Sequence, residues 1–177
     1  RCSEDCKYCA QSISYKTNVD EYPLLETDEL VTQAKYNDER GILRYSIVTS
    51  GKKLKDNEVD QVAKSIKEIK KQTNIAVCVS LGLLDETQFK KLKVAGASRV
   101  HNNLETSRNY FPQVCTTHTY DDKIAAIYAA RKSGLSVCSG GILGLGESME
   151  DRIDMALTLR ELNVDSIPLN MLNPIVG

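Results

Sequence analysis

The sequence predicts an α/β fold in which repeated strand–helix units are arranged around a parallel sheet. Short runs rich in β-branched residues alternate along the chain with amphipathic segments of helical periodicity. Several of the strand runs place bulky apolar residues on one face and small or polar residues on the other. No Pro-rich or Ser-rich linker divides the chain, so we expect a single domain over residues 1–177.

Each element follows from a local pattern. Five β-rich runs are expected to be strands: residues 43–50, 75–81, 99–104, 135–142 and 166–172. The segments between them have apolar residues at helical spacing and are expected to be helices: residues 27–39, 57–71, 85–94, 120–132 and 149–162. The expected N-caps are Thr27, Asp56, Thr119 and Ser148. Gly41, Gly96 and Gly134 fall where helices should end.

The alternation within the strands indicates what the sheet encloses. In residues 75–81 the odd positions are bulky and apolar, whereas the even positions, including Cys78, are small or polar. Residues 135–142 repeat this pattern, with Cys138 on the small face. The third strand also has a polar face, formed by His101, Asn103 and Glu105. A closed parallel barrel usually fills its interior with apolar layers, so this polar lining predicts a cavity that holds a ligand.

The bulk composition excludes two classes of partner. Net charge is −1, and the basic run 64–71 is interrupted by Glu68 and reads as a solvated helix face, so we expect no nucleic-acid partner. No stretch approaches the roughly 20 apolar residues that cross a bilayer, so we expect no membrane span. Thiolates intended for iron need a reducing compartment, which favours the cytoplasm.

Three cysteines near the start of the chain carry the strongest chemical signal. Cys2, Cys6 and Cys9 have the spacing Cys-x-x-x-Cys-x-x-Cys, and three thiolates can hold three irons of a 4Fe–4S cluster. The fourth iron would then be free to bind a small molecule. This pattern resembles that of the radical S-adenosylmethionine (SAM) enzymes, and Tyr8 before the last cysteine adds to the match.

Plainer interpretations stay open for these residues. The motif could belong to a structural zinc site, completed by one of the remaining cysteines or histidines: Cys78, Cys115, Cys138, His101 or His118. A disulfide framework is a weaker alternative, because six cysteines in 177 residues are not dense. The two histidines are more often hydrogen-bonded structural residues than metal ligands.

Two further features point to ligands. Residues 140–147 are rich in glycine, follow a strand and precede a helix, and Gly140, Gly141 and Gly144 permit close backbone approach. This motif is weak alone, but beside the iron–sulfur signature it is consistent with a nucleoside-containing ligand. Cys78 and Cys138 lie on inward strand faces, where a single buried cysteine is as often a small apolar core residue as a ligand. Together with Cys115 in a strand-to-helix connection, they indicate a second ligand set.

Five blocks together carry a specific resemblance: residues 4–12, 103–107, 116–120, 137–141 and 167–172. In this order they resemble the biotin synthase family of radical SAM enzymes over nearly the whole chain. The resemblance implies a (β/α)8 TIM-type barrel, of which the chain would supply about strands two to six. The start at the cluster motif and the end at residues 173–177 favour one radical SAM barrel domain that is incomplete at both ends.

The resemblance also implies an activity. The enzyme would be a radical SAM sulfurtransferase that cleaves SAM to a 5′-deoxyadenosyl radical and inserts sulfur into dethiobiotin, giving biotin. Sulfur would come from an auxiliary iron–sulfur cluster, 2Fe–2S or larger, inside the barrel. Electrons would come from a low-potential donor of the flavodoxin or ferredoxin type, and the full-length protein would be a cytoplasmic homodimer.

Individual residues carry over by resemblance. The 4Fe–4S ligands would be Cys2, Cys6 and Cys9, and the auxiliary ligands would include Cys78 and Cys138. Contacts to SAM would come from Tyr8, Asn103, Glu105 and the glycines Gly140, Gly141 and Gly144. Contacts to dethiobiotin would come from His101, Asn103 and Asn170.

Two departures from the family pattern matter. Ser46 stands where the better-known form has a third auxiliary cysteine, and Cys115 stands where that form has an aliphatic residue. We hypothesise that Cys115 replaces the missing ligand. His101 occupies a substrate-contacting position usually held by asparagine. Alternatives are a related radical SAM enzyme of the hydrogenase-maturation or methylornithine type, or a non-catalytic iron–sulfur or zinc protein.

Overall fold

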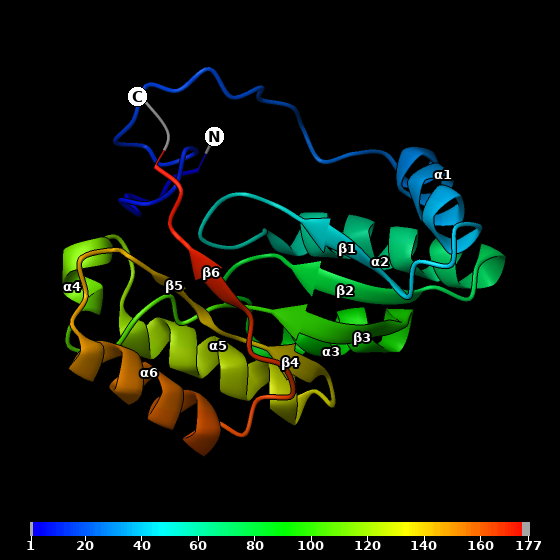
Figure 1. Cartoon of the computed structure of the whole chain (residues 1–177). Helices are drawn as coiled ribbons and strands as arrows, with labels where there is room; N and C mark the ends of the chain where they lie inside the picture. The colour runs from blue at the N-terminus through cyan, green and yellow to red at the C-terminus, as the bar shows by residue number, and fades with distance from the viewer. Residues whose placement is uncertain (1, 175–177) are drawn as a thin grey trace.

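The computed structural model describes residues 2–174 and is shown in Figure 1. The expectation that the domain is incomplete at its C-terminal end was based on residues 173–177, of which residues 175–177 lie outside the described range. Along the chain the elements are α1 (Thr27–Asp38), β1 (Arg44–Val48), α2 (Asp56–Gln72), β2 (Ala76–Ser80), α3 (Glu86–Ala95), β3 (Ala97–His101), α4 (Phe111–Val114), α5 (Tyr120–Lys132), β4 (Ser136–Cys138), β5 (Gly141–Leu143), α6 (Met149–Glu161) and β6 (Leu169–Met171).

The strands form one curved wall. Four of them pair in parallel in the order β1-β2-β3-β4, and β5 pairs in parallel with β6. Isolated parallel bridges, Cys138 to Ser166 and Glu105 to Gly141, continue the pairing from the first sheet to the second. The strand order therefore follows the chain without reversal, and the long helices between the strands lie on one side of the wall (Figure 1). A doubly wound sheet would reverse its order, so the predicted barrel-type fold is confirmed.

The hydrophobic core lies between this wall and the helices. Val77 and Val79 of β2 and Val137 of β4 are completely buried, as the alternation predicted. They share one apolar cluster with the inner face of α2, whose buried residues recur every three or four positions: Val59, Val62, Ile66 and Ile69. Full burial of each such side chain stabilises the fold by about 1.5–3 kcal/mol. The opposite face of the strands is left for the polar residues.

The predicted helix boundaries are nearly all correct. The side chains of Thr119 and Ser148 cap α5 and α6 as expected, each accepting a hydrogen bond from the third helical amide. Gly96 ends α3 in the left-handed conformation, with φ of 116°. The other two expected caps are wrong by one residue: the extended residues before α1 and α2 are Glu26 and Lys55 rather than Thr27 and Asp56.

The fold differs from the prediction in several places. β3 ends at His101, so Asn103 and Glu105 follow this strand instead of lying on its face, and β6 covers only Leu169–Met171 of the expected 166–172. The expected strand 135–142 is interrupted between β4 and β5, because the Gly140 amide turns to donate to Asn103 Oδ1 at 3.0 Å. The backbone there lies so close to the Pro168 carbonyl that a Cβ on Gly140 would be 1.8 Å from its oxygen. The short helix α4 was not predicted, because four residues are too few to show periodicity.

The segment before α1 forms neither helix nor strand and crosses the carboxyl ends of the strands (Figure 1). The Lys7 amide donates to the Val114 carbonyl at 3.0 Å, which joins this segment to the end of α4. Cys2 Sγ accepts a hydrogen bond from the Gly51 amide, just beyond β1. The cysteine motif therefore lies at the end of the barrel where ligand sites of this fold occur. Within residues 2–174, no helix is long and apolar enough to cross a membrane.

Candidate functional site

The three motif cysteines lie on a loop, here called the cluster loop (residues 2–17). All three thiols are free and half-buried. Cys2 Sγ accepts hydrogen bonds from the Glu4 amide at 3.4 Å and the Gly51 amide at 3.2 Å. Amides directed at a sulfur stabilise its thiolate form and are typical of the surroundings of iron–sulfur ligands. The loop therefore fits a three-thiolate iron–sulfur site.

Asp5 fastens the cluster loop to the connection between α4 and α5. Its Oδ1 accepts hydrogen bonds from the Thr116 amide at 2.9 Å and the Thr117 amide at 3.2 Å. The same oxygen accepts from the Cys115 thiol at 3.2 Å, and Oδ2 accepts from the Thr116 hydroxyl. These bonds, led by those from Thr116, hold the pKa of Asp5 well below its usual range. The loop is thus fixed by an ionised carboxylate.

Glu4 adds a buried contact to the same connection. Its carboxylate is 2.7 Å from His118 Nδ1 and 2.8 Å from the Thr117 hydroxyl. Burial raises the pKa of Glu4, but the hydrogen bonds from His118, Thr117 and Ser3 outweigh it and leave this pKa lowered. Burial lowers the pKa of His118. His118 is therefore neutral near pH 7, and its Nδ1–H donates to Glu4.

Cys115 lies next to the cluster loop. Donor atoms of Cys6, Cys115 and His118 are all within 4.8 Å of one another, the one such group of three in residues 2–174. Burial, and next the Cys115 thiol, raise the pKa of Cys6. Neither Cys78 nor Cys138 joins this group. The structure thus places Cys115 beside Cys6 and not with the strand cysteines, so the hypothesis that it completes the auxiliary ligand set gains no support here.

The strand cysteines occupy the inner face of the wall. Cys78 in β2 lies opposite Ser46 in β1, and Cys138 in β4 lies opposite His101 in β3. His101 Nδ1 is 3.4 Å from Cys138 Sγ, and burial lowers the pKa of His101. Burial also raises the pKa of Cys78, with a further contribution from Cys138. The two thiols are thus close enough to interact, and Ser46 donates to the first of them.

Positive charge also faces the strand thiols. The guanidinium groups of Arg44 and Arg99 act against the rise in the pKa of Cys78. Arg99 Nε is 3.3 Å from the Ser136 hydroxyl, so its side chain lies along the inner face of the wall. A thiolate pair with arginines beside it can carry the negative charge of an iron–sulfur centre.

The polar residues after β3 form a buried group with the cluster loop. Asn103 Nδ2 is 3.4 Å from Glu105 Oε2, and its Oδ1 accepts from the Gly140 amide. Burial, and next the Glu105 carboxylate, raise the pKa of Tyr8, whose hydroxyl donates to that carboxylate. Glu105 adopts a φ of 73°, which is strained for a residue with a side chain. Such strain concentrates at ligand sites.

Beside this group, three buried polar atoms have no hydrogen-bond partner: Asn102 Nδ2, Thr106 Oγ1 and Ser139 Oγ. Buried polar groups are nearly always paired, so unpaired ones indicate a missing ligand or water. They flank Asn103, Glu105 and Gly140 in the sequence, which are three of the predicted SAM contacts. The donor set and its unpaired neighbours fit a bound polar molecule.

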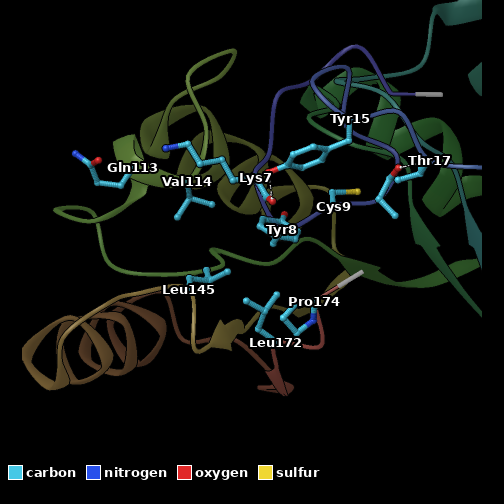
Figure 2. Close-up of a pocket in the computed structure, with 11 residues that line it drawn as sticks. Lys7, Tyr8, Cys9, Tyr15, Thr17, Gln113, Val114, Leu145, Leu172 and Pro174 are labelled. Carbon is cyan, nitrogen blue, oxygen red and sulfur yellow. Dashed lines mark hydrogen bonds between the residues drawn. The ribbon is translucent and has the colours of Figure 1, made fainter. Parts of the chain in front are cut away.

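A cavity of about 270 Å³ lies between the cluster loop and the C-terminal strands (Figure 2). Tyr8 and Cys9 line one side, and Leu145, Leu172 and Pro174 line the other. Leu145 belongs to the glycine-rich turn, so the loop that carries the cysteines and the turn predicted to contact SAM border the same space.

The remaining predicted residues are dispersed. Gly144 has a φ of 96° and its amide donates to the Glu147 carboxylate at 2.9 Å. Gly141 packs against Met155 and the Glu105 backbone, closer than a Cβ would allow. Asn170 lies on β6, an edge strand of the described residues, and is exposed. The structure therefore does not bring Asn170 together with His101 and Asn103 through any direct contact.

Sequence reasoning missed the residues that hold the loop. The roles of Glu4, Asp5 and Thr117 were not predicted, although all three lie within the blocks that carried the family resemblance. A signal was present: two adjacent acidic residues inside a cysteine motif are costly unless donors neutralise them.

The fold and this site define a class of protein. A family model described as the radical SAM superfamily matches residues 1–159, and the chain belongs to that superfamily. Among curated proteins, the chain is 59% identical over all 177 residues to the biotin synthase of Brachyspira hyodysenteriae and 58% identical to that of Clostridium botulinum strain Alaska E43. It spans about half of their length, 53% and 56% respectively.

Solved structures show the same fold at low identity. Methylornithine synthase has a TM-score of 0.85 and 18% identity, over 98% of this chain and 51% of that one. The FeFe-hydrogenase maturase HydG from Carboxydothermus hydrogenoformans has a TM-score of 0.80 and 19% identity, over 98% of this chain and 42% of that one.

Proposed function

We propose that the full-length protein is a biotin synthase, a radical SAM sulfurtransferase that converts dethiobiotin to biotin. The observation that carries this proposal is the identity of 58–59% to biotin synthases along the entire chain. Residues 1–177 would form part of a single barrel domain. The arrangement of two separate cysteine sets, one on the cluster loop and one on strands, supports an enzyme that needs two iron–sulfur centres.

The cluster loop would hold the first centre. Cys2, Cys6 and Cys9 would bind three irons of a 4Fe–4S cluster, which when bound supplies the electron that splits SAM into methionine and a 5′-deoxyadenosyl radical. The chain positions this loop with Asp5 and Glu4, whose hydrogen bonds reach Thr116, Thr117 and His118. A fixed loop keeps the reacting groups in one geometry.

SAM would lie between the cluster loop and the glycine-rich turn. Asn103 and Glu105 offer a buried amide and carboxylate for ribose hydroxyls, and Tyr8 restrains that carboxylate. Gly140 and Gly141 bring the backbone close, since side chains there would collide with Pro168 and Glu105. Burial of these groups excludes water, which would otherwise solvate and misdirect the reacting molecules.

The inner face of the wall would hold the sulfur source. Cys78 and Cys138 are the two thiolates present for an auxiliary iron–sulfur cluster, with Arg44 and Arg99 beside them. Ser46 occupies the register position opposite Cys78, so a hydroxyl stands where a third thiol would fit. His101, 3.4 Å from Cys138, would lie at the boundary between this cluster and dethiobiotin.

The partners follow from this chemistry. The reaction requires a low-potential electron donor, for which we propose a flavodoxin or ferredoxin. The half-exposed cysteines of the cluster loop support delivery of the electron from the protein surface. We further propose that the enzyme is a homodimer. We also propose a cytoplasmic location, because free thiols are kept in a reducing compartment.

Two cysteine variants of the full-length protein test the function. After anaerobic reconstitution with iron and sulfide, the protein would receive SAM, dithionite and dethiobiotin, and mass spectrometry would quantify 5′-deoxyadenosine and biotin. We expect Cys9→Ala to abolish both products, because the first cluster loses a ligand. Cys78→Ala should still form 5′-deoxyadenosine but lose biotin, because only the sulfur source is damaged.

The wild-type result decides between the alternatives. Deoxyadenosine without biotin would reject dethiobiotin as substrate and favour a radical SAM enzyme of the methylornithine or hydrogenase-maturation type. Absence of both products from a fully reconstituted protein would reject the radical chemistry.

A further inference from the structure

Cys115 and His118 bring soft metal donors to a thiol of the cysteine motif. Cys115 Sγ is 3.3 Å from His118 Nδ1 and 3.8 Å from Nε2, and the Cys6 thiol lies within 4.8 Å of Cys115 Sγ and of one ring nitrogen of His118. Two sulfurs bound to one zinc ion at 2.3 Å each in tetrahedral geometry lie about 3.8 Å apart. The three donors lie close enough to share one ion once the Cys115 side chain rotates, because its Sγ now lies nearer to Nδ1 than to Nε2.

A buried carboxylate already orients the histidine as metal sites require. Glu4 accepts from His118 Nδ1, which leaves the lone pair on Nε2 free to bind a cation. Metal-bound histidines almost always donate their other N–H to a carboxylate or carbonyl in this way. The side chains of His118 and Glu4 are 6% and 7% exposed, so the pair is shielded from water.

We propose that the cluster-free protein binds a single Zn²⁺ ion through Cys6, Cys115 and His118 Nε2. Three protein ligands leave the fourth tetrahedral position for water. Binding releases the proton of each thiol, including the one that Cys115 now donates to Asp5 at 3.2 Å, and no electron is transferred. Asp5 keeps its hydrogen bonds from the amides of Thr116 and Thr117.

This zinc site and the 4Fe–4S cluster exclude each other, because both require Cys6. The zinc form would keep one motif thiol occupied while Cys2 and Cys9 remain free. Zinc bound before iron would thus block cluster assembly, although it leaves the cluster loop folded. The proposal concerns the protein before it receives iron and does not depend on dethiobiotin being the substrate.

The test uses the full-length protein prepared free of iron and fully reduced. Zn²⁺ affinity would be measured by competition with a chromophoric chelator, and Co²⁺ would serve as a spectroscopic probe that reports the number of bound thiolates. We expect one ion per chain and a spectrum of two thiolates. Cys115→Ser should weaken Zn²⁺ binding at least about 100-fold, and Glu4→Gln should weaken it about 10- to 100-fold, as loss of such an orienting partner typically does.

Matched variants separate this site from other thiols. Cys2→Ser and Cys9→Ser test binding by the motif alone, Cys78→Ser tests a buried thiol elsewhere, and Glu147→Gln tests another buried carboxylate. All four should bind Zn²⁺ as the wild type does. Equal affinity of Cys115→Ser and wild type, a Co²⁺ spectrum of three thiolates, or a matching loss in Cys2→Ser would each overturn the proposal.

The spectrum of the wild-type protein stays decisive even if Cys115→Ser fails to fold. A further readout is the visible absorption of the iron–sulfur cluster during reconstitution. Prior addition of one equivalent of Zn²⁺ should slow cluster formation in the wild type, but not in a folded Cys115→Ser variant. Equal slowing in both proteins would show that zinc blocks the cluster without Cys115 and would overturn the proposed site.

Discussion

The cluster loop and the strand wall hold cysteines by different physical means. Cys78 and Cys138 are placed by the sheet itself, because register fixes which residues lie opposite each other: Ser46 faces Cys78 and His101 faces Cys138. The cluster loop has no regular backbone pairing along residues 2–17. Its thiols are placed by carboxylate tethers to residues that are 110–114 positions away in the sequence.

The difference shows where each site is vulnerable. A strand ligand is lost only when the sheet is disturbed, whereas a loop ligand is lost when one tether is cut. Substitutions in the wall should therefore lower global stability. Those in the tethers should loosen the loop and leave the wall intact.

The largest effect is expected in the wall, from Gly140→Ala. A Cβ there would lie 1.8 Å from the Pro168 carbonyl oxygen, and backbone on both sides would have to move. We expect the free energy of unfolding of the full-length protein to fall by about 3 kcal/mol, measured by urea denaturation.

Gly41→Ala is the matched control. Gly41 has a φ of +72° but no atom within 4 Å of an added Cβ. Only the cost of the left-handed backbone remains, about 1 kcal/mol. Equal losses in the two variants would show that close approach to Pro168 does not constrain the junction of β4 and β5.

An intermediate effect is expected from Asp5→Asn in the cluster loop. The amide group cannot accept the charged hydrogen bonds from Thr116 and Thr117 as strongly. Loss of about 1–2 kcal/mol of local stability should raise hydrogen exchange in residues 2–17 about tenfold. Exchange in β2 should not change, as measured by mass spectrometry on the cluster-free protein.

The control is Asp20→Asn, which changes an exposed carboxylate in the same segment. It should leave exchange in the loop unaltered. Protection of residues 2–17 that survives Asp5→Asn would mean that the thiols are positioned by something other than this tether.

The smallest effect is expected at Glu147, whose carboxylate accepts hydrogen bonds from the Gly144 amide of the glycine-rich turn and from Arg152. Burial raises the pKa of Glu147, but hydrogen bonds from the Gly144 amide and from Arg152 outweigh it and leave this pKa below its ordinary 4.5. The folded protein thus favours the ionised form. Its stabilisation is complete above about pH 4.5 and is lost as pH falls through the lowered pKa of the folded state.

Urea denaturation of wild type and Glu147→Gln at several pH values measures this contribution. We expect a difference of about 1 kcal/mol at pH 7, because Glu147 is buried and hydrogen-bonded, and we expect it to vanish under acidic conditions. A difference that does not depend on pH would assign the effect of Glu147 to packing instead of charge.

The wall could be predicted from sequence far better than the tethers. Periodicity in residues 75–81 depends only on neighbours, so Val77 and Val79 were correctly assigned to the core. The repeated units predicted the parallel α/β sheet, and the family resemblance implied the barrel. The contact between Glu4 and His118 joins positions 114 residues apart, and no local pattern reports such a pair.

Within the site, too, features that depend on local spacing could be predicted and features that depend on tertiary contacts could not. The motif spacing suggested that Cys2, Cys6 and Cys9 act together, and the cluster loop brings them to the carboxyl ends of the strands. The environment of Cys115 could not be predicted. Its neighbours Asp5 and Cys6 come from a loop whose path depends on tertiary hydrogen bonds.

The large sequence separation between the tethered residues determines when the cluster loop can become ordered during translation. Ribosomes add about 5–20 residues per second, so His118 is made about 6–23 s after Glu4. During that interval the motif thiols are part of a nascent chain without the partners that arrange them. Iron delivered then would meet a disordered set of thiols. Ordered motif thiols are therefore available to a cluster only after the chain has been translated as far as His118.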